Sequence, residues 1–92
     1  MESSRLGFRQ AASMASVGAL QARGGRYDEA ERSVLQALAA DPASAHALEL
    51  LGAIRLKLGN PAGAREAWEK CLAVQPENDR VRDLLKRLDQ TR

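Results

Sequence analysis

Apolar residues recur at intervals of three and four positions along most of the chain, which is the spacing of one face of an α-helix. The pattern predicts five helices, at residues 11–23, 27–40, 45–58, 61–74 and 79–90. Residues 1–10 are polar and interrupted by Gly7, so we expect a flexible or partly helical lead-in there. The residues expected on the buried faces are, in chain order, Met14, Val17, Leu20, Gln21, Ala30, Val34, Ala37, Leu38, Leu48, Leu51, Ile54, Arg55, Ala64, Trp68, Cys71, Leu72, Val81, Leu84, Leu85 and Leu88.

The breaks between these helices carry residues that begin and end helices. Asn60 can cap the fourth helix with its side-chain oxygen, and Pro61 suits the first helical position, where no backbone donor is needed. Gly59 can end the preceding helix in a left-handed conformation. Ser44 and Asn78 are candidate caps for the third and fifth helices. These signals predict tight corners between successive helices.

The chain repeats itself at an offset of about 34 residues, a period typical of helical repeat arrays. Laying residues 11–42 over 45–76 places glycine on glycine and proline on proline. The identical pairs include Gly18/Gly52, Gly25/Gly59, Ala30/Ala64, Leu38/Leu72 and Pro42/Pro76. Conservative pairs are Met14/Leu48, Val17/Leu51, Leu20/Ile54 and Val34/Trp68. The sequence therefore contains two copies of one helical hairpin, followed by a single helix.

This pattern resembles the tetratricopeptide repeat, in which Leu-Gly, an aromatic residue, a later alanine, a second aromatic residue and a closing proline recur. The residues that carry the resemblance are Gly18, Gly25, Tyr27, Ala30, Pro42, Gly52, Gly59, Ala64, Trp68 and Pro76. The resemblance implies an all-α fold of antiparallel helix hairpins stacked in a short right-handed superhelix. It implies a domain at residues 11–92, with repeats at about 11–44 and 45–78 and a capping helix at about 79–90. The chain departs from the pattern at Gln21 and Arg55, where the family often has an aromatic residue, and at Pro61, which replaces a turn tyrosine.

The two ends of the predicted stack differ. The last helix covers the C-terminal end and turns its charged side chains to water. Nothing equally obvious covers the first hairpin. Either residues 3–10, which include Leu6 and Phe8, fold over it, or another chain does.

The resemblance also implies that the first helix of each repeat lines a concave face that binds a partner. The residues expected on that face are Ala12, Ala15, Ala19, Arg23, His46, Glu49, Ala53, Leu56, Lys57, Arg80, Asp83 and Arg87. Its N-terminal half is rich in alanine and its C-terminal half is charged, which suits a helical or extended segment with an apolar stripe. The alternative is that the alanines are ordinary helix surface, because single exposed small residues need no explanation.

Members of the family that hold the acidic C-terminus of heat-shock chaperones resemble one another in a set of Lys, Asn and Arg on this face. Ala15, Ala19 and Leu50 stand at three of those places here. Of the final basic pair only Arg80 is present, with Leu84 at the other place. The sequence therefore argues against a chaperone co-factor of that type.

Composition and charge narrow the function classes further. The chain has 14 basic and 12 acidic residues in mixed order and only 3% aromatic residues, so we expect no nucleic-acid binding. No stretch approaches the roughly 20 apolar residues of a membrane span, so we expect no membrane insertion. The single cysteine, Cys71, cannot form an internal disulfide, which fits a reducing, cytoplasmic location.

No group of residues suggests catalysis, a metal or a cofactor. His46 and Glu49 share one helix face, but two ligands do not make a metal site. Cys71 is expected to be a core thiol and Trp68 a packing anchor. The sequence contains no Gly-rich phosphate loop and no Ser/His/Asp set, so we expect no enzyme. We therefore expect an adaptor or scaffold that binds a protein or peptide segment in its concave groove; the alternative is a structural module that self-associates through the first hairpin and the N-terminal segment.

Overall fold

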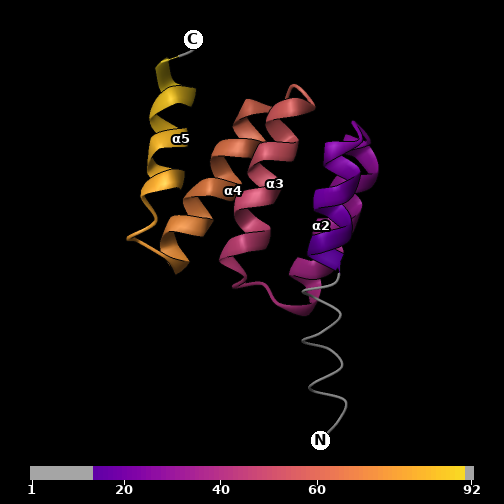
Figure 1. Cartoon of the computed structure of the whole chain (residues 1–92). Coiled ribbons are helices and arrows are strands. Elements are labelled where there is room, and N and C mark those ends of the chain that lie inside the picture. Colours follow the sequence, from indigo (N-terminus) through magenta and orange to yellow (C-terminus); the bar gives the residue numbers. More distant parts are fainter. Residues whose placement is uncertain (1–13, 91–92) are drawn as a thin grey trace, which may run out of the picture.

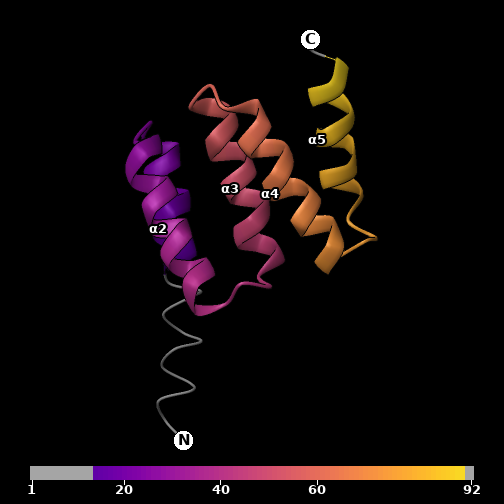
Figure 2. The same cartoon turned by 180° about the vertical axis from the view of Figure 1, so that it is seen from behind.

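The structure, a computed structural model, describes residues 14–90, and helices joined by short turns account for them without any strand. Residues 14–23 are helical and are followed by α2 (Tyr27–Ala40), α3 (Ala45–Lys57), α4 (Pro61–Val74) and α5 (Asp79–Gln90). The helices lie side by side in chain order, with α5 at one end and α2 and the first helix at the other (Figures 1 and 2). The all-α fold of stacked helical hairpins is confirmed. The expectations for residues 1–10, and for Ala12, lie outside the described residues.

Side-chain caps begin α3, α4 and α5 as predicted. The Oδ1 atom of Asn60 accepts a hydrogen bond from the backbone N–H of Gly63 at 3.0 Å, and Pro61 occupies the first turn of α4. Ser44 caps α3 and Asn78 caps α5 in the same way. Each cap satisfies a backbone donor that the helix itself leaves without a partner, which fixes where these helices start.

The turns inside the two hairpins are built alike. Gly25 and Gly59 have φ angles of +81° and +80°, a left-handed conformation that glycine adopts without steric cost. The backbone N–H of Arg26 donates to the carbonyl of Gln21 at 2.8 Å, and the N–H of Asn60 donates to that of Arg55 at 2.9 Å. The two donors, Arg26 and Asn60, are 34 positions apart, and so are the two acceptors, Gln21 and Arg55. The repeat in the sequence is therefore a repeat in backbone geometry.

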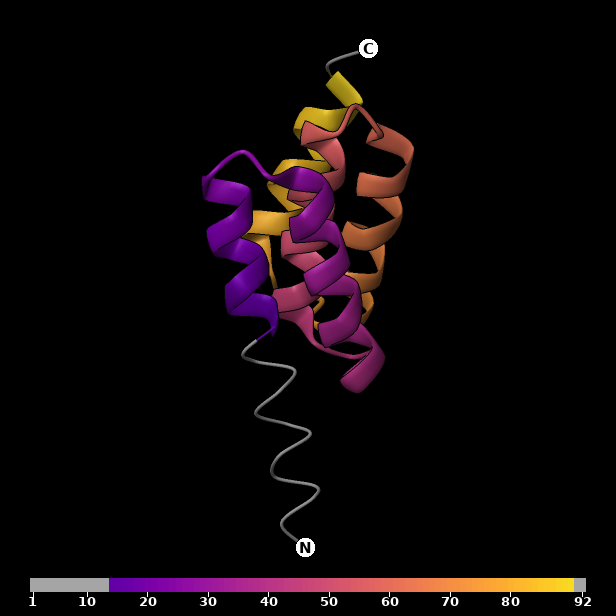
Figure 3. The same cartoon turned by 90° about the vertical axis from the view of Figure 1, so that its right-hand side faces the viewer.

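Within each hairpin, a glycine allows the helices to approach closely. A Cβ atom at Gly18 would lie 2.6 Å from Cγ2 of Val34, and one at Gly52 would overlap the indole ring of Trp68. The indole Nε1 of Trp68 donates to the carbonyl of Glu49 at 3.0 Å, so the buried ring has its polar atom satisfied. Figure 3 shows the first helix and α2 packed as such a pair.

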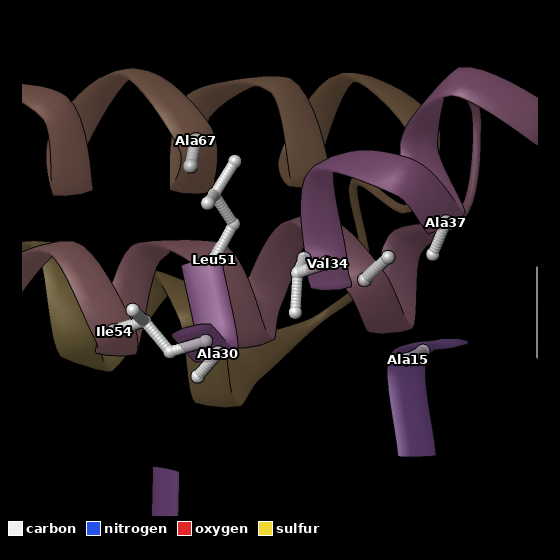
Figure 4. Close-up of a cluster of buried hydrophobic side chains, with 8 residues drawn as sticks. Ala15, Ala30, Val34, Ala37, Leu51, Ile54 and Ala67 are labelled. Atoms are coloured by element: carbon white, nitrogen blue, oxygen red, sulfur yellow. The ribbon is translucent and has the colours of Figure 1, made fainter. Parts of the chain in front are cut away.

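The main core lies between the two hairpins. Leu51 and Ile54 of α3 belong to the same buried cluster as Ala30 and Val34 of α2. Figure 4 shows these side chains gathered where the helices meet. Burying a leucine or isoleucine side chain contributes about 1.5–3 kcal/mol, so this contact holds the repeats together as one unit.

The C-terminal helix α5 covers the outer side of the second hairpin. Val81 is buried with Trp68 and Cys71, and the leucines of α5 pack against this second cluster. An ion pair between Arg65 of α4 and Asp89 joins the two helices at the surface. The amphipathic pattern predicted for this helix is confirmed.

The prediction for the buried face of the first helix was wrong at two of its four positions, since Met14 packs against the core but Val17 and Leu20 do not. Val17 and Leu20 are 37% and 66% exposed, whereas Ala15 is only 3% exposed and belongs to the core. The face that meets α2 is the one centred on Gly18, because only small residues permit that close contact. Val17 and Leu20 are the repeat counterparts of Leu51 and Ile54, which pack against the preceding hairpin. No hairpin precedes the first helix among the described residues, so this face stays open.

Candidate functional site

A hollow of about 290 Å³ lies between the first helix and α3. Its apolar walls come from the first helix, from α3 and from the start of α2; they are formed by Ala19, Ala22, Tyr27, Leu50, Ala53 and Ile54. Arg23 and Lys57 complete the lining. We call this site the inter-repeat hollow. It exists because two helices with alanines on facing positions sit side by side without side chains large enough to fill the space.

The two cations of the inter-repeat hollow hold equivalent positions. Arg23 and Lys57 are 34 residues apart, and each stands four residues after an alanine of the hollow, Ala19 or Ala53. Neither cation is within ion-pair distance of a carboxylate in the described part of the chain. None of the lining residues is acidic. The hollow is therefore apolar inside and positively charged at two points.

The surface beyond the hollow, toward α5, is polar. Glu49 accepts hydrogen bonds from Arg80 at 3.4 Å and from the side-chain amide of Asn78 at 3.5 Å. Asp83 and Arg87 of α5 form an exposed ion pair at 3.3 Å. The contacts of Glu49 join α3 to the start of α5, and both pairs hold predicted binding residues against one another.

The structure brings together four of the residues predicted on the concave face and separates others from them. Ala19, Arg23, Ala53 and Lys57 all line the inter-repeat hollow. Ala15 does not face a partner, because it is buried against α2, which corrects the prediction for that position.

The remaining predicted residues lie outside the hollow. His46 and Leu56 are exposed on α3, and Arg80 is exposed on α5. Glu49 is half-buried and has the partners described above.

Sequence reasoning missed Leu50 and Ile54 as walls of the hollow. Ile54 was expected only in the core, and Leu50 was noted only as a departure from the chaperone-binding pattern. The signal was present, because apolar residues occur all round α3 rather than on one stripe. A helix with that pattern has neighbours on more than one side, so its apolar surface exceeds what a single partner helix covers.

Two other hollows are less suited to a ligand. One, of about 260 Å³, lies on the other side of the stack and is bordered by Arg55 and Lys70, whose charges are already paired with Glu31 and Glu66. The other is lined only by charged residues of α5, so one helix forms all of its walls. Neither combines walls from both repeats with unpaired charge.

The described residues show no sign of a metal site or of a reactive thiol. Residues 14–90 contain no group of three or more His, Cys, Asp or Glu side chains that could hold a metal ion. Cys71 is fully buried, and its Sγ donates to the carbonyl of Ala45 at 3.3 Å. Burial raises the pKa of this thiol, with a further contribution from the charge of Glu49. A thiol in that setting stays protonated and is a poor nucleophile. No helix in the same part of the chain is long and apolar enough to cross a membrane.

Two like-built hairpins, a shared core between them and a capping helix define a helical-repeat protein with a groove between its repeats. The family model described as tetratricopeptide repeat matches residues 18–81. The chain belongs to the tetratricopeptide repeat family, whose repeats generally mediate protein–protein interaction. A comparison with curated proteins gave no match.

Proposed function

We propose that this chain is an adaptor or scaffold module that binds a helical or extended segment of a partner protein across the concave face formed by the first helix, α3 and α5. The observation that supports the proposal best is the inter-repeat hollow, which leaves apolar surface of both repeats accessible. Its volume lies near the lower end of the range for small-molecule pockets, about 300–1,000 Å³. It is therefore suited to one or two side chains of a partner rather than to a whole cofactor.

The experiment is affinity capture from a cell lysate, followed by mass spectrometry, with the wild type and two charge-matched variants. Ala53→Glu places a carboxylate in the hollow at an exposed helix position, so it leaves the core untouched. Ala73→Glu changes an exposed alanine of α4 that does not line the hollow. We expect Ala53→Glu to lose partners that both the wild type and Ala73→Glu retain. Equal capture by all three proteins would contradict the concave-face assignment.

Self-association through the first hairpin is a second candidate function, and the exposure of Val17 and Leu20 favours it. The counterparts of these residues in the second repeat are buried against a neighbouring hairpin, so the first helix carries a surface shaped for the same kind of contact. An exposed apolar surface of this kind often marks an interface.

Light scattering at high micromolar concentration tests this candidate. We expect the molar mass of the wild type to exceed that of one chain and to fall to that of one chain for Leu20→Glu. Arg32→Glu, at an exposed position of α2, is the control and is expected to behave as the wild type does. A monomeric wild type at that concentration would rule the candidate out.

A further inference from the structure

The inter-repeat hollow carries information about the chemistry of its occupant. Two of its apolar residues, Ala19 and Ala53, and its two cations come from equivalent positions of the two repeats, so both features recur along the direction in which an extended segment would lie. An occupant that matches one feature alone leaves the other unsatisfied. The hollow therefore selects for a segment that combines an apolar side chain with negative charge.

The apolar part of the hollow has room for a large side chain. Leu50 and Ile54 form walls on α3, and Ala19 and Ala53 leave the space between the helices open. Covering these surfaces removes apolar area from water, which stabilises a complex by roughly 25 cal/mol per Å² before the cost of association is counted. A leucine, isoleucine, methionine or phenylalanine side chain makes this contact, whereas a polar side chain would lose its hydration there without gaining a partner.

The charged part of the hollow lacks the partners that other cations in the fold possess. Arg55, Arg65 and Lys70 all pair with carboxylates of the chain, whereas within residues 14–90 Arg23 and Lys57 have no such partner. Both are exposed, and both stand next to the apolar walls rather than on a distant face. A carboxylate of the occupant placed beside the apolar side chain would reach either cation.

We propose that the inter-repeat hollow binds an acidic segment of a partner protein, taking one large apolar side chain between the two repeats while neighbouring Asp or Glu side chains pair with Arg23 and Lys57. This inference rests on the proposed groove function and adds the chemistry of the segment. The carboxylates are side-chain groups within the partner chain rather than its C-terminus, because cations from two successive repeats call for charge on both sides of the apolar residue.

A library of random twelve-residue peptides, displayed internally in a carrier protein, tests the inference without knowledge of the natural partner. We expect the wild type to enrich peptides in which a large apolar residue is flanked by Asp or Glu. The double variant Arg23→Glu/Lys57→Glu should instead enrich peptides with Lys or Arg beside the apolar residue. Arg32→Glu/Lys86→Glu changes the net charge equally at two cations outside the hollow and is expected to select as the wild type does.

The best enriched peptide is then synthesised with an amidated C-terminus, and its Kd shows how much Arg23 and Lys57 contribute to binding. We expect its Kd to weaken by about tenfold for the Arg23→Glu/Lys57→Glu variant, since two exposed attractive pairs become repulsive. Raising the salt concentration should weaken wild-type binding as well, because exposed charge pairs are screened. Enrichment of peptides without acidic residues, no enrichment at all, or a requirement for a free C-terminal carboxylate would each overturn the inference.

Failure of the inference is distinguishable from failure of the groove function. If Ala53→Glu abolishes capture of cellular partners while Arg23→Glu/Lys57→Glu does not, the groove binds a partner but the acidic chemistry is wrong. If neither variant changes capture, the groove function itself fails.

Discussion

At the scale of single residues, Gly52 occupies a position where an added methyl group would clash with a neighbouring side chain. Alanine is the better helix former, so a glycine-to-alanine change inside a helix ordinarily stabilises it by about 0.5–1 kcal/mol. Here the new Cβ would overlap the ring of Trp68, which is fully buried and cannot swing away. Packing therefore outweighs helix propensity at this residue.

We expect Gly52→Ala to lower the free energy of unfolding by about 1–3 kcal/mol, the range found for overpacked cores. The measurement is urea unfolding followed by the fluorescence of Trp68. Gly24→Ala is the matched control, because its Cβ would have only ordinary contacts, the nearest at 3.6 Å. A Gly52→Ala protein as stable as the Gly24→Ala protein would show that α3 and α4 can move apart to fit the methyl group without a loss of stability.

Cys71 gives the stability of the protein a dependence on pH. Burial, and then the charge of Glu49, raise the pKa of the thiol above its ordinary value, while the hydrogen bond from Asn78 and the charge of Arg80 oppose the shift. The folded state therefore keeps the proton at pH values where the unfolded thiol, with a pKa of about 8.5, has lost it. The contribution to stability is complete below the unfolded pKa and is lost as the pH rises through the folded pKa.

We expect the unfolding free energy of the wild type to fall between about pH 7 and pH 10 more steeply than that of Cys71→Ala. Other groups titrate in this range in both proteins, so the difference between the two profiles isolates the thiol. Urea unfolding at a series of pH values provides the measurement. Parallel profiles would mean that the folded thiol ionises as readily as the unfolded one.

At the scale of helices, α5 closes the second hairpin. Val81 is fully buried, and three leucines of α5 cover the cluster that contains Trp68 and Cys71. Burial of the valine alone corresponds to about 1.5–3 kcal/mol, and the half-buried leucines add to it.

A chain that ends at Asn78 should therefore be less stable by at least about 3 kcal/mol, and the emission of Trp68 should shift to longer wavelength as water reaches the ring. Urea unfolding and fluorescence spectra provide both readouts. Arg82→Ala, at an exposed position of the same helix, is expected to change neither. An unshifted spectrum in the shortened chain would mean that α5 does not shield Trp68.

The sequence predicted the features that depend on residues close together in the chain, such as the starts of helices. It did not predict the features that depend on which helix packs against which. The first residues of α3 and α4 were predictable, because the side chains of Ser44 and Asn60 accept hydrogen bonds from backbone N–H groups three residues further along the chain. The buried face of the first helix was not, because periodicity shows that two faces differ but does not show which one meets a partner. Val17 and Leu20 are apolar, yet they are exposed in the described part of the chain. The walls of the inter-repeat hollow depend on the spacing of two helices; the apolar residues all round α3 indicate several neighbours but not which residues stay uncovered.

At the scale of the whole molecule, equivalent positions of the two repeats should respond differently to the same substitution. Leu20 and Ile54 occupy the same place in their repeats, but the first is exposed and the second is buried. We expect Ile54→Ala to cost about 2–5 kcal/mol and Leu20→Ala to stay within about 0.5 kcal/mol at a concentration where the protein is monomeric.

Urea unfolding of the two variants, each compared with the wild type, measures this difference. Val17→Ala and Leu51→Ala form a second pair of equivalent positions and should show the same contrast. A comparable loss for Leu20→Ala in the monomer would indicate that another part of the chain covers the first helix.

The charged outer side of α5 sets a limit on how copies of this chain can assemble. In α5, Arg82 and Lys86 stand where Leu48 and Gly52 meet the next helix in the second repeat, and both are exposed. Charged side chains at these two positions disfavour the close apolar contact that a further helix would make there, so we expect no head-to-tail stacking through α5. If two chains associate through their first helices, as the second candidate function has it, the contact uses the same surface on both partners. Such a contact is closed, so we expect self-association through that surface to give a dimer rather than a filament.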